Sequence, residues 1–281
     1  MTAMTILVTG ATGNIGRELL RDLRAHGAGP VRGLTRDPAR AAFPDGVEAV
    51  AGDLARADSL KAALDGVVSL FLVPGAVGEA DVVAAAREAG VEHVVLVSSI
   101  TVETHPHLPA AAQNHALEEV LRGSGMAWTV LRATQFTSNT LWWAESIREH
   151  GTVRAPYGDV GLPAIHPGDI AAVARVALTE PGHRGRVHAL TGPERITPRQ
   201  QVAQIAAAAG REVSFVEIGR EEAHRQLAPL LGAEIADAVL DLTGGDVNEG
   251  LLAVRDTVPR LTGAPGRTFR QWAEEHADAF R

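Results

Sequence analysis

Three glycines, Gly10, Gly13 and Gly16, follow the first apolar run of the chain in the stretch TGATGNIG. A glycine at a strand end allows a tight turn, a second lets the backbone approach a pyrophosphate, and a third lets the following helix pack closely on the sheet. The helix N-terminus then offers free N–H groups and the positive end of its dipole to phosphate. A dinucleotide is therefore expected here, although a glycine-rich turn that binds nothing can have the same spacing. The expected contacts are Gly10, Thr12, Gly13, Asn14, Ile15 and Gly16.

Side chains that could transfer protons or attack a substrate are scarce. The chain has no cysteine, one lysine (Lys61) and one tyrosine (Tyr157). Disulfides, thiolate catalysis and cysteine-ligated metals are thereby excluded. His105 and His107 lie close together, but no carboxylate or third ligand is spaced to join them, so no metal site is expected.

The elements that must position these residues alternate along the first half of the chain. Strands are expected at 5–8, 31–34, 47–50, 67–72, 93–97 and 128–131, and helices at 14–25, 58–64, 80–89 and 112–122. Strands alternating with helices at this spacing predict parallel βαβ units. The apolar strand HVVLV indicates a sheet that is covered on both faces.

After residue 132 the pattern changes. A helix is expected over 136–151, another over 170–179 with Asp169 as its N-cap, and a third capped by Thr197 with Pro198 at its first position. Late strands are expected at 185–190 and 213–218, followed by mostly helical sequence. The predicted fold is α/β, a Rossmann-type doubly wound parallel sheet with a smaller, mostly C-terminal α/β lobe. The sheet takes 1–134 with 167–190 returning to it, and the lobe takes 135–166 and 191–281.

Composition limits the partners. The 281 residues are 46% apolar with a net charge of −8. No basic cluster suggests nucleic acid, because phosphate binding depends on grouped positive charge. No apolar run approaches the roughly 20 residues that span a membrane, and the first ten residues lack the basic region of a signal peptide. We expect a cytoplasmic protein, for which a homodimer is compatible.

The full motif VTGATGNIG, spaced GxxGxxG, resembles the short-chain dehydrogenase/reductase superfamily, and more closely its atypical, NmrA-like NAD(P)-binding branch. GDL at 52–54 is generic to the superfamily. More specific are VVLVSS at 94–99, SGMAWTVLRATQFTSN at 124–139, HPGDIAAVA at 166–174 and TGAPGRTFRQWAEEHA at 262–277. The resemblance covers most of the chain and implies a nicotinamide cofactor.

The end of the second strand, GLTRDPAR, bears on which cofactor is used. An NAD-preferring site carries an acidic residue there for the ribose 2′-hydroxyl. This chain has Arg36, with Arg40 about one turn later, and the arginine fork suits a 2′-phosphate. NADPH is therefore favoured over NADH, although Arg36 and Asp37 could instead form a solvated surface pair. The resemblance implies that Asp53 and Leu54 flank the adenine and that Leu72, Val73 and Pro74 line the cofactor cleft.

The same resemblance implies a catalytic Tyr-x-x-x-Lys pair, and this chain lacks it. Alignment of HALEEVLRGSG puts Ala111 at the tyrosine position and His115 at the lysine position. His115 is the first candidate to replace the pair, because imidazole titrates near neutrality and can act as an acid. Glu119, one turn later, could orient His115, or the two could form a surface pair.

Two serines and an aromatic segment complete the candidate site. The resemblance implies that Ser98 or Ser99, at the end of the fifth strand, faces the nicotinamide or a substrate carbonyl, although both could simply cap a loop. It also implies a substrate pocket, where aromatic walls with a few polar groups would suit a flat, apolar ligand. Adjacent helical residues point about 100° apart, so only one of Trp142 and Trp143 is expected to line the pocket, the other packing in the core. The expected substrate contacts are Gln135, Phe136, Asn139, Trp143 and Tyr157.

Two hypotheses of function follow. The first is an NADPH-dependent oxidoreductase that reduces a quinone, an enone or a related aromatic small molecule, since these accept hydride and can take their proton from water while the cofactor supplies the chemistry. The alternative is a non-catalytic NADP-binding redox sensor acting through a protein partner, which the missing tyrosine and lysine favour. A sugar epimerase is less favoured, because it generally depends on the same pair.

Overall fold

The computed structural model describes residues 4–75 and 78–281, so residues 1–3 of the expected sheet domain and residues 76–77 lie outside the described residues. The chain divides into two compact units. The first comprises Met1–Ala133, Pro167–Leu190 and Thr257–Ala264, and the second comprises Thr134–His166, Thr191–Asp256 and Pro265–Arg281.

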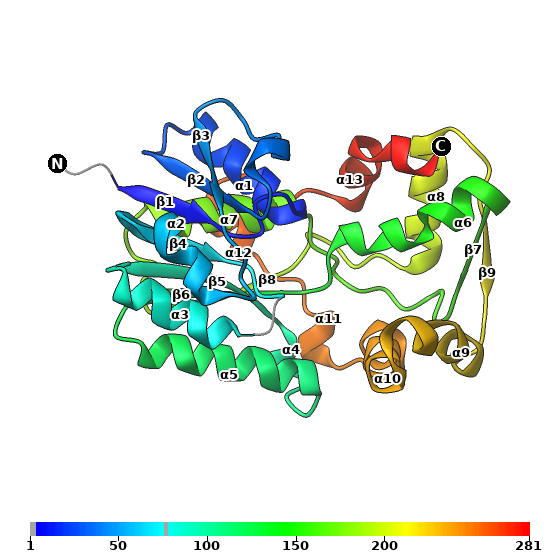
Figure 1. Cartoon of the computed structure of the whole chain (residues 1–281). Coiled ribbons are helices and arrows are strands. Elements are labelled where there is room, and N and C mark those ends of the chain that lie inside the picture. The colour runs from blue at the N-terminus through cyan, green and yellow to red at the C-terminus, as the bar shows by residue number, and fades with distance from the viewer. Residues whose placement is uncertain (1–3, 76–77) are drawn as a thin grey trace. The chain divides into compact units, whose positions relative to one another are not determined.

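The first unit contains a seven-stranded sheet in the order β3-β2-β1-β4-β5-β6-β8, with every pair parallel (Figure 1). The strand order runs outward from the β1–β4 pair, through β2 and β3 on one side and through β5, β6 and β8 on the other, which is the doubly wound arrangement. Ligands of such sheets bind beyond the carboxyl ends of the strands at this reversal of order. The Rossmann-type fold is therefore confirmed. The strands are β1 (Thr5–Val8), β2 (Val31–Thr35), β3 (Val47–Ala51), β4 (Val67–Leu72), β5 (His93–Ser99), β6 (Ala127–Ala133) and β8 (Arg186–Leu190).

Helices cover both faces of this sheet. Alternate strand residues point to opposite faces, and Leu7, Leu70 and Leu96 share a core with the helices α2 (Lys61–Leu64), α3 (Glu79–Glu88) and α5 (Pro109–Gly123). Their neighbours Phe71 and Val95 are equally buried, on the face covered by α1 (Asn14–Ala25), α7 (Pro167–Thr179) and α12 (Thr257–Thr262). Both faces are therefore apolar. The remaining short helices are η1 (Pro38–Arg40), η2 (Ala57–Leu60) and α4 (Thr101–Thr104).

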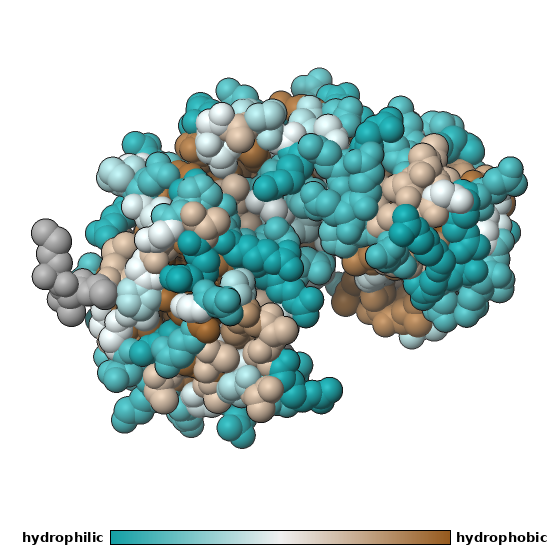
Figure 2. All heavy atoms as spheres, turned by 90° about the horizontal axis from the view of Figure 1, so that it is seen from above, coloured by the Kyte–Doolittle hydropathy of each residue, from teal (hydrophilic) through white to brown (hydrophobic). Residues whose placement is uncertain are grey.

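The second unit is built on a two-stranded parallel sheet, β7 (Thr152–Ala155) with β9 (Ser214–Glu217). Its core gathers around Trp272, which is completely buried with Phe269 and Phe280. Figure 2 shows apolar side chains gathered at the lower right, on this unit. Its helices are η3 (Thr137–Trp143), α6 (Ala144–His150), α8 (Pro198–Ala209), α9 (Arg220–Leu231), α10 (Ala233–Leu240), the π-helical η4 (Asp241–Gly245), α11 (Glu249–Leu252), α13 (Phe269–Glu275) and η5 (Ala277–Phe280).

Three local predictions need correction. The helix expected over 136–151 is a 3₁₀ helix, Thr137–Trp143, followed by a short α-helix. Helix α7 begins at Pro167, so Asp169 lies in its first turn instead of capping it. The segment Thr257–Ala264, expected in the smaller lobe, belongs to the first unit, because α12 buries Val258 while it packs beside α7 and β8.

The prediction of Thr197 as an N-cap is confirmed. Its side chain accepts a hydrogen bond from the Gln200 N–H in a capping box, with Pro198 at the first turn. Within the described part of the chain, no helix combines the length and the apolar character needed to cross a membrane.

Candidate functional site

The glycine motif forms a compact loop between β1 and α1. Gly10 has a φ of +58°, in the left-handed region that favours glycine. A Cβ added to Gly16 would lie 2.2 Å from the Gly10 carbonyl oxygen and 2.8 Å from the Ala11 Cα, closer than side-chain atoms ever approach. The first turn of α1 therefore rests directly on the loop backbone, and only glycine fits at position 16.

The N-terminus of α1 is open to a ligand. Gly13 is the N-cap residue and provides no side-chain hydrogen bond to the first turn, whose N–H groups also lack partners within the helix. Together with the helix dipole they favour an anion. Thr12 and Asn14 are exposed, whereas the Ile15 side chain is buried, so Ile15 can contribute only through its backbone. The loop fits a pyrophosphate.

Arg36 lies directly after β2 and is exposed. Among the described residues it forms no ion pair, with Asp37 or any other carboxylate. The backbone N–H of Asp37 donates instead to Thr35 Oγ1 at 3.2 Å. The alternative of a solvated Arg36–Asp37 pair is thus not what the structure contains, and the guanidinium is free to bind a phosphate.

Leu72, Val73 and Pro74, at the end of β4, differ in how far their side chains are exposed. Leu72 is completely buried in the sheet core, so its side chain does not line a cleft as expected. Val73 and Pro74 keep part of their surface exposed, and the Val73 N–H donates to Thr9 Oγ1 at 2.9 Å, which ties the end of β4 to β1. Val73 also lies against Gly10, where an added Cβ would be 3.3 Å from its Cβ.

Asp53 and Leu54, expected beside the adenine, follow β3 and are half-buried. The Asp53 carboxylate accepts the Ala55 N–H at 3.1 Å, and the Asp53 N–H donates to Ser59 Oγ at 2.9 Å. These bonds fix the turn while leaving part of both side chains exposed.

Ser98 belongs to a buried network that the sequence did not predict. Its hydroxyl donates to Glu118 Oε1 at 2.7 Å, and Arg132 donates to both oxygens of that carboxylate at 3.0 and 2.7 Å. Arg122 adds a third contact at 2.9 Å. Burial raises the pKa of the Glu118 carboxyl, but the hydrogen bonds from Arg132 and Ser98, with the charges of Arg132 and Arg122, lower that pKa below its usual value overall. Ser98 is therefore committed to holding a carboxylate.

Ser99 has a different environment at the end of β5. Its oxygen accepts hydrogen bonds from the Thr101 N–H at 3.2 Å and from Thr101 Oγ1 at 2.7 Å. A hydroxyl has two acceptor sites and one proton, so its own O–H remains available. Ser99 is half-buried and can donate to a ligand beyond the carboxyl end of β5.

His115 lies on α5 and is exposed, while Ala111, at the family's tyrosine position, is buried. Glu119, one turn after His115, forms an ion pair with Arg122. The expected His115–Glu119 pair is therefore absent, and the imidazole has no carboxylate orienting it among the described residues.

The second unit encloses a cavity of about 430 Å³, within the range of small-molecule sites. Gln135 and Phe136 reach it from a short segment that pairs with Ile165, whose N–H donates to the Gln135 carbonyl at 2.9 Å. Arg154 is the charged residue of this lining, and its guanidinium binds Glu222 at 2.5 Å. The uncharged polar lining residues are Gln135, Asn139, Thr140, Gln201, Gln226 and Thr243.

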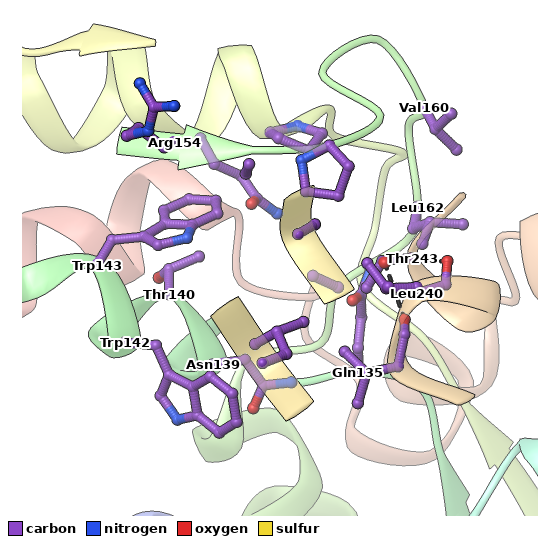
Figure 3. A pocket seen from close by; sticks show the side chains of 18 of the residues that line it. Gln135, Asn139, Thr140, Trp142, Trp143, Arg154, Val160, Leu162, Leu240 and Thr243 are labelled. Atoms are coloured by element: carbon purple, nitrogen blue, oxygen red, sulfur yellow. Dashed lines mark hydrogen bonds between the residues drawn. The ribbon is translucent and has the colours of Figure 1, made fainter. Parts of the chain in front are cut away.

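Both tryptophans of η3 line this cavity, which corrects the expectation that only one does. Trp142 is 65% exposed, whereas Trp143 also packs against the core around Trp272. Figure 3 shows Trp142 beside Asn139 on one side of the cavity, and Leu162 and Leu240 on the other.

Tyr157 is not part of the lining, although its neighbours Pro156 and Val160 are. The wall contains instead residues that sequence reasoning missed, from α9, α10 and η4: Ala223, Gln226, Leu227, Val239, Leu240 and Thr243. No local pattern marks them, because long-range packing brings them to the cavity. Glu118 did leave a signal, since it lies seven residues after the buried Ala111 and three before the buried Leu121, on the inward face of α5.

The histidines do not form a metal centre. Within residues 4–75 and 78–281, no three His, Asp or Glu side chains come together as ligands. His105 is buried with its ring 5.9 Å from that of His107 and its Nδ1 2.9 Å from Thr104 Oγ1. His166 is buried as well, with Nε2 3.0 Å from Glu275 Oε2.

Comparison with known proteins matches residues 10–181 to a family described as NAD(P)H-binding. The chain is 43% identical to the (4-alkanoyl-5-oxo-2,5-dihydrofuran-3-yl)methyl phosphate reductase of Streptomyces griseus, covering 98% of this chain and 99% of that one. It is 37% identical to the NAD(P)H azoreductase of Xenophilus azovorans, with the same coverage. The solved NADPH-dependent quinone oxidoreductase of Escherichia coli, complexed with NADPH, is similar with a TM-score of 0.80 at 28% identity, covering 96% of this chain and 99% of that one.

Proposed function

The chain belongs to the NAD(P)H-binding family, and on that premise we propose that it is a reductase of the atypical short-chain type that uses NADPH to reduce a quinone, an enone or a related aromatic small molecule. The relatives named above reduce a furanone phosphate, azo compounds and quinones. Each of these acceptors has a conjugated, electron-poor centre.

The observation that carries this proposal is the chemistry of the second unit's cavity. Its walls are aromatic and aliphatic, its polar groups are amides and hydroxyls, and its one charged residue is neutralised by Glu222. Such a site suits a flat, uncharged ligand that is oriented by a few hydrogen bonds. A volume of about 430 Å³ has room for a substrate of more than one ring.

The first unit supplies the residues for the cofactor. The Gly10–Gly16 loop and the open turn of α1 would hold the pyrophosphate, Arg36 would bind the 2′-phosphate and so select NADPH, and Asp53 and Leu54 would flank the adenine. When bound, NADPH provides the hydride. Val73, Pro74 and the backbone at Leu72 would border the cofactor at the end of β4.

The reaction also needs a proton, which residues of the chain or water must supply. Reduction of a quinone or enone takes one hydride and one proton, and the oxygen that gains negative charge needs a hydrogen-bond donor. We assign the role of this donor to Ser99, whose O–H is free, and the role of proton source to His115, which is exposed to water. Water can also supply it directly, so the tyrosine of the usual pair is not required.

The test is NADPH oxidation followed by near-ultraviolet absorbance, with separate quinone, enone and simple ketone acceptors and NADH in parallel. The expected result is turnover with quinones and enones, little with simple ketones, and a lower KM for NADPH than for NADH. Turnover restricted to simple ketones, or equal use of the two cofactors, would contradict the proposal.

The partner is a small apolar or aromatic substrate, with no nucleic acid. The net charge of −8 without a basic cluster supports this, and the absence of cysteine agrees with the cytoplasm. A homodimer is compatible with these properties, and light scattering on the purified chain would detect it.

A further inference from the structure

Tyr157 has an unusual backbone conformation. Among the described residues it alone has a positive φ, +57°, without being glycine. A bulky residue in this region is strained and persists only where surrounding contacts hold it. Two hydrogen bonds hold the backbone here. The Tyr157 carbonyl accepts the Val160 N–H at 3.0 Å, and the N–H of the next residue, Gly158, donates to Glu217 Oε1 at 3.3 Å.

The ring of Tyr157 lies against two glycines of η4. A Cβ added to Gly244 would lie 2.3 Å from Tyr157 Cγ, and one added to Gly245 would lie 3.0 Å from the Tyr157 hydroxyl. The ring also packs on the cluster of Ile218, Ala223 and Leu240. No larger residue than glycine leaves room for the ring here.

The hydroxyl of Tyr157 meets a charged network. Arg220, the first residue of α9, donates to it at 3.3 Å. The same guanidinium donates to Asp237 of α10 at 3.0 Å and pairs with Asp241 of η4 at 2.8 Å. Tyr157 thus contacts α9 through Arg220 and η4 through its ring.

These helices, residues 220–245, form one wall of the cavity through Leu227, Leu240 and Thr243 among others. Tyr157 lies outside the lining, yet its ring packs against the cluster of Ile218, Ala223 and Leu240, and all three residues of that cluster face the cavity. A shift of the ring is therefore transmitted directly to that wall.

We infer that Tyr157 is a positioning residue, which holds the 220–245 segment from outside the cavity and so sets the width of the substrate pocket. The inference rests on the proposed function, because it takes this cavity as the substrate site. A displacement of the wall by a fraction of an ångström weakens substrate binding, whereas cofactor binding, which uses residues of the first unit, does not change.

The test compares Tyr157→Gly and Tyr157→Phe with the wild type. Glycine relieves the backbone strain and removes the ring, whereas phenylalanine keeps the ring and removes only the hydroxyl. Two quantities are measured for 2-methyl-1,4-naphthoquinone: its KM at saturating NADPH, and its Kd without cofactor from quenching of tryptophan fluorescence. We expect Tyr157→Gly to raise both about tenfold and Tyr157→Phe about twofold, with the NADPH Kd nearly unchanged. The Tm of Tyr157→Gly should fall, because the ring packs on the cluster of Ile218, Ala223 and Leu240, whereas the Tm of Tyr157→Phe should change little.

A second pair of variants covers the case in which Tyr157→Gly does not fold. Gly244→Ala pushes the ring away while leaving Tyr157 intact, so it should raise the quinone KM as well. The matched control is Gly219→Ala, where an added Cβ meets nothing within 4 Å and the KM should not change. An unchanged quinone Kd in both Tyr157→Gly and Gly244→Ala would overturn the inference, as would an equal rise in the NADPH Kd.

A variant in the lining separates this inference from the proposed function. Trp142→Ala removes an exposed wall residue and should raise the quinone KM if the cavity is the substrate site. If Trp142→Ala raises the KM and the Tyr157 variants do not, only the role of Tyr157 is wrong. If none of them changes the KM while turnover persists, the assignment of the cavity fails, and the inference fails with it.

Discussion

Ser98 and Ser99 are neighbours in the chain but differ in what their hydroxyls do. Ser98 donates to the buried carboxylate of Glu118, whereas Ser99 accepts two hydrogen bonds from Thr101 and keeps its proton available. Ser99 is thus the hydroxyl that can take over hydrogen bonding to a reacting oxygen in a chain without the usual tyrosine. The sequence marked both serines equally, because the difference depends on Glu118, twenty residues away on another element.

Ser99→Ala and Ser98→Ala form a matched pair that tests this division. Loss of the Ser99 donor should lower kcat/KM for a quinone by about tenfold to a hundredfold, the value of one hydrogen bond to a developing charge. Ser98→Ala leaves Glu118 bound to two arginines, so activity should change less than about twofold while stability falls by about 1 kcal/mol. Steady-state kinetics and urea unfolding measure the two effects. The opposite pattern would reassign the donor to Ser98.

Arg36→Gln tests the choice of cofactor. Removing an unpaired guanidinium from a 2′-phosphate site costs a charge-assisted hydrogen bond, so the KM for NADPH should rise about tenfold to a hundredfold. The KM for NADH, which has no 2′-phosphate, should stay the same. Arg21→Gln is the control, since Arg21 is exposed and pairs with Glu18 in the surface. An equal rise for both cofactors would show that Arg36 supports the fold instead.

At the scale of elements, local patterns predicted what local physics determines. The strand Val67–Leu72 and the helix Asn14–Ala25 were predicted to the residue, because apolar runs and the glycine turn define their ends. Helix α7 was predicted to start too late, since Asp169 suggested an N-cap although Pro167 suits a first position. The wall of α9, α10 and η4 could not be predicted, because its place at the cavity depends on packing between distant segments.

Two buried histidines on the sheet make the first unit sensitive to acid. His93 of β5 has its ring Nε2 3.0 Å from Thr129 Oγ1. The Nε2 of His188 in β8 lies 3.3 Å from the Nδ1 of His183. Burial first, then Arg184 and His183, lowers the pKa of His93 to about 4. For His188, burial, then His183 and nearby arginines, also lowers the pKa to about 4.

Because both imidazoles stay neutral in the fold but protonate below pH 6.5 when unfolded, stability falls as the pH drops from about 6.5 towards 4. When the pH is lowered from 7 to 5, each histidine should reduce the free energy of unfolding by about 2 kcal/mol. Urea unfolding at both pH values should show this loss, and His93→Gln should reduce it. His150→Gln, at an exposed site, is the control. Equal losses in wild type and His93→Gln would rule out this origin.

In the whole molecule, the residues proposed to bind the cofactor and those proposed to bind the substrate belong to different units. The dinucleotide loop belongs to the first and the aromatic cavity to the second. Each unit has its own core, around the doubly wound sheet and around Trp272 respectively. Cofactor binding and substrate binding can therefore be disrupted separately.

Gly16→Ala tests that separation. The new Cβ would collide with the Gly10 carbonyl at 2.2 Å, so the loop must shift and NADPH binding should weaken at least about a hundredfold. Quenching of tryptophan fluorescence by 2-methyl-1,4-naphthoquinone should persist with a Kd within about twofold of the wild type. Circular dichroism would verify that the variant is folded. Loss of both ligands in a folded variant would show that the two sites are not separable.

In the proposed reaction, NADPH bound to this chain passes its hydride to a conjugated acceptor. The most direct measurement is a single turnover without oxygen, in which enzyme loaded with NADPH is mixed with 2-methyl-1,4-naphthoquinone and both are followed by absorbance. We expect each NADPH oxidised to yield one hydroquinone, and Ser99→Ala to slow this step. NADPH that binds tightly yet is oxidised by no quinone or enone would rule out the proposed reductase and identify the chain as an NADP-binding sensor.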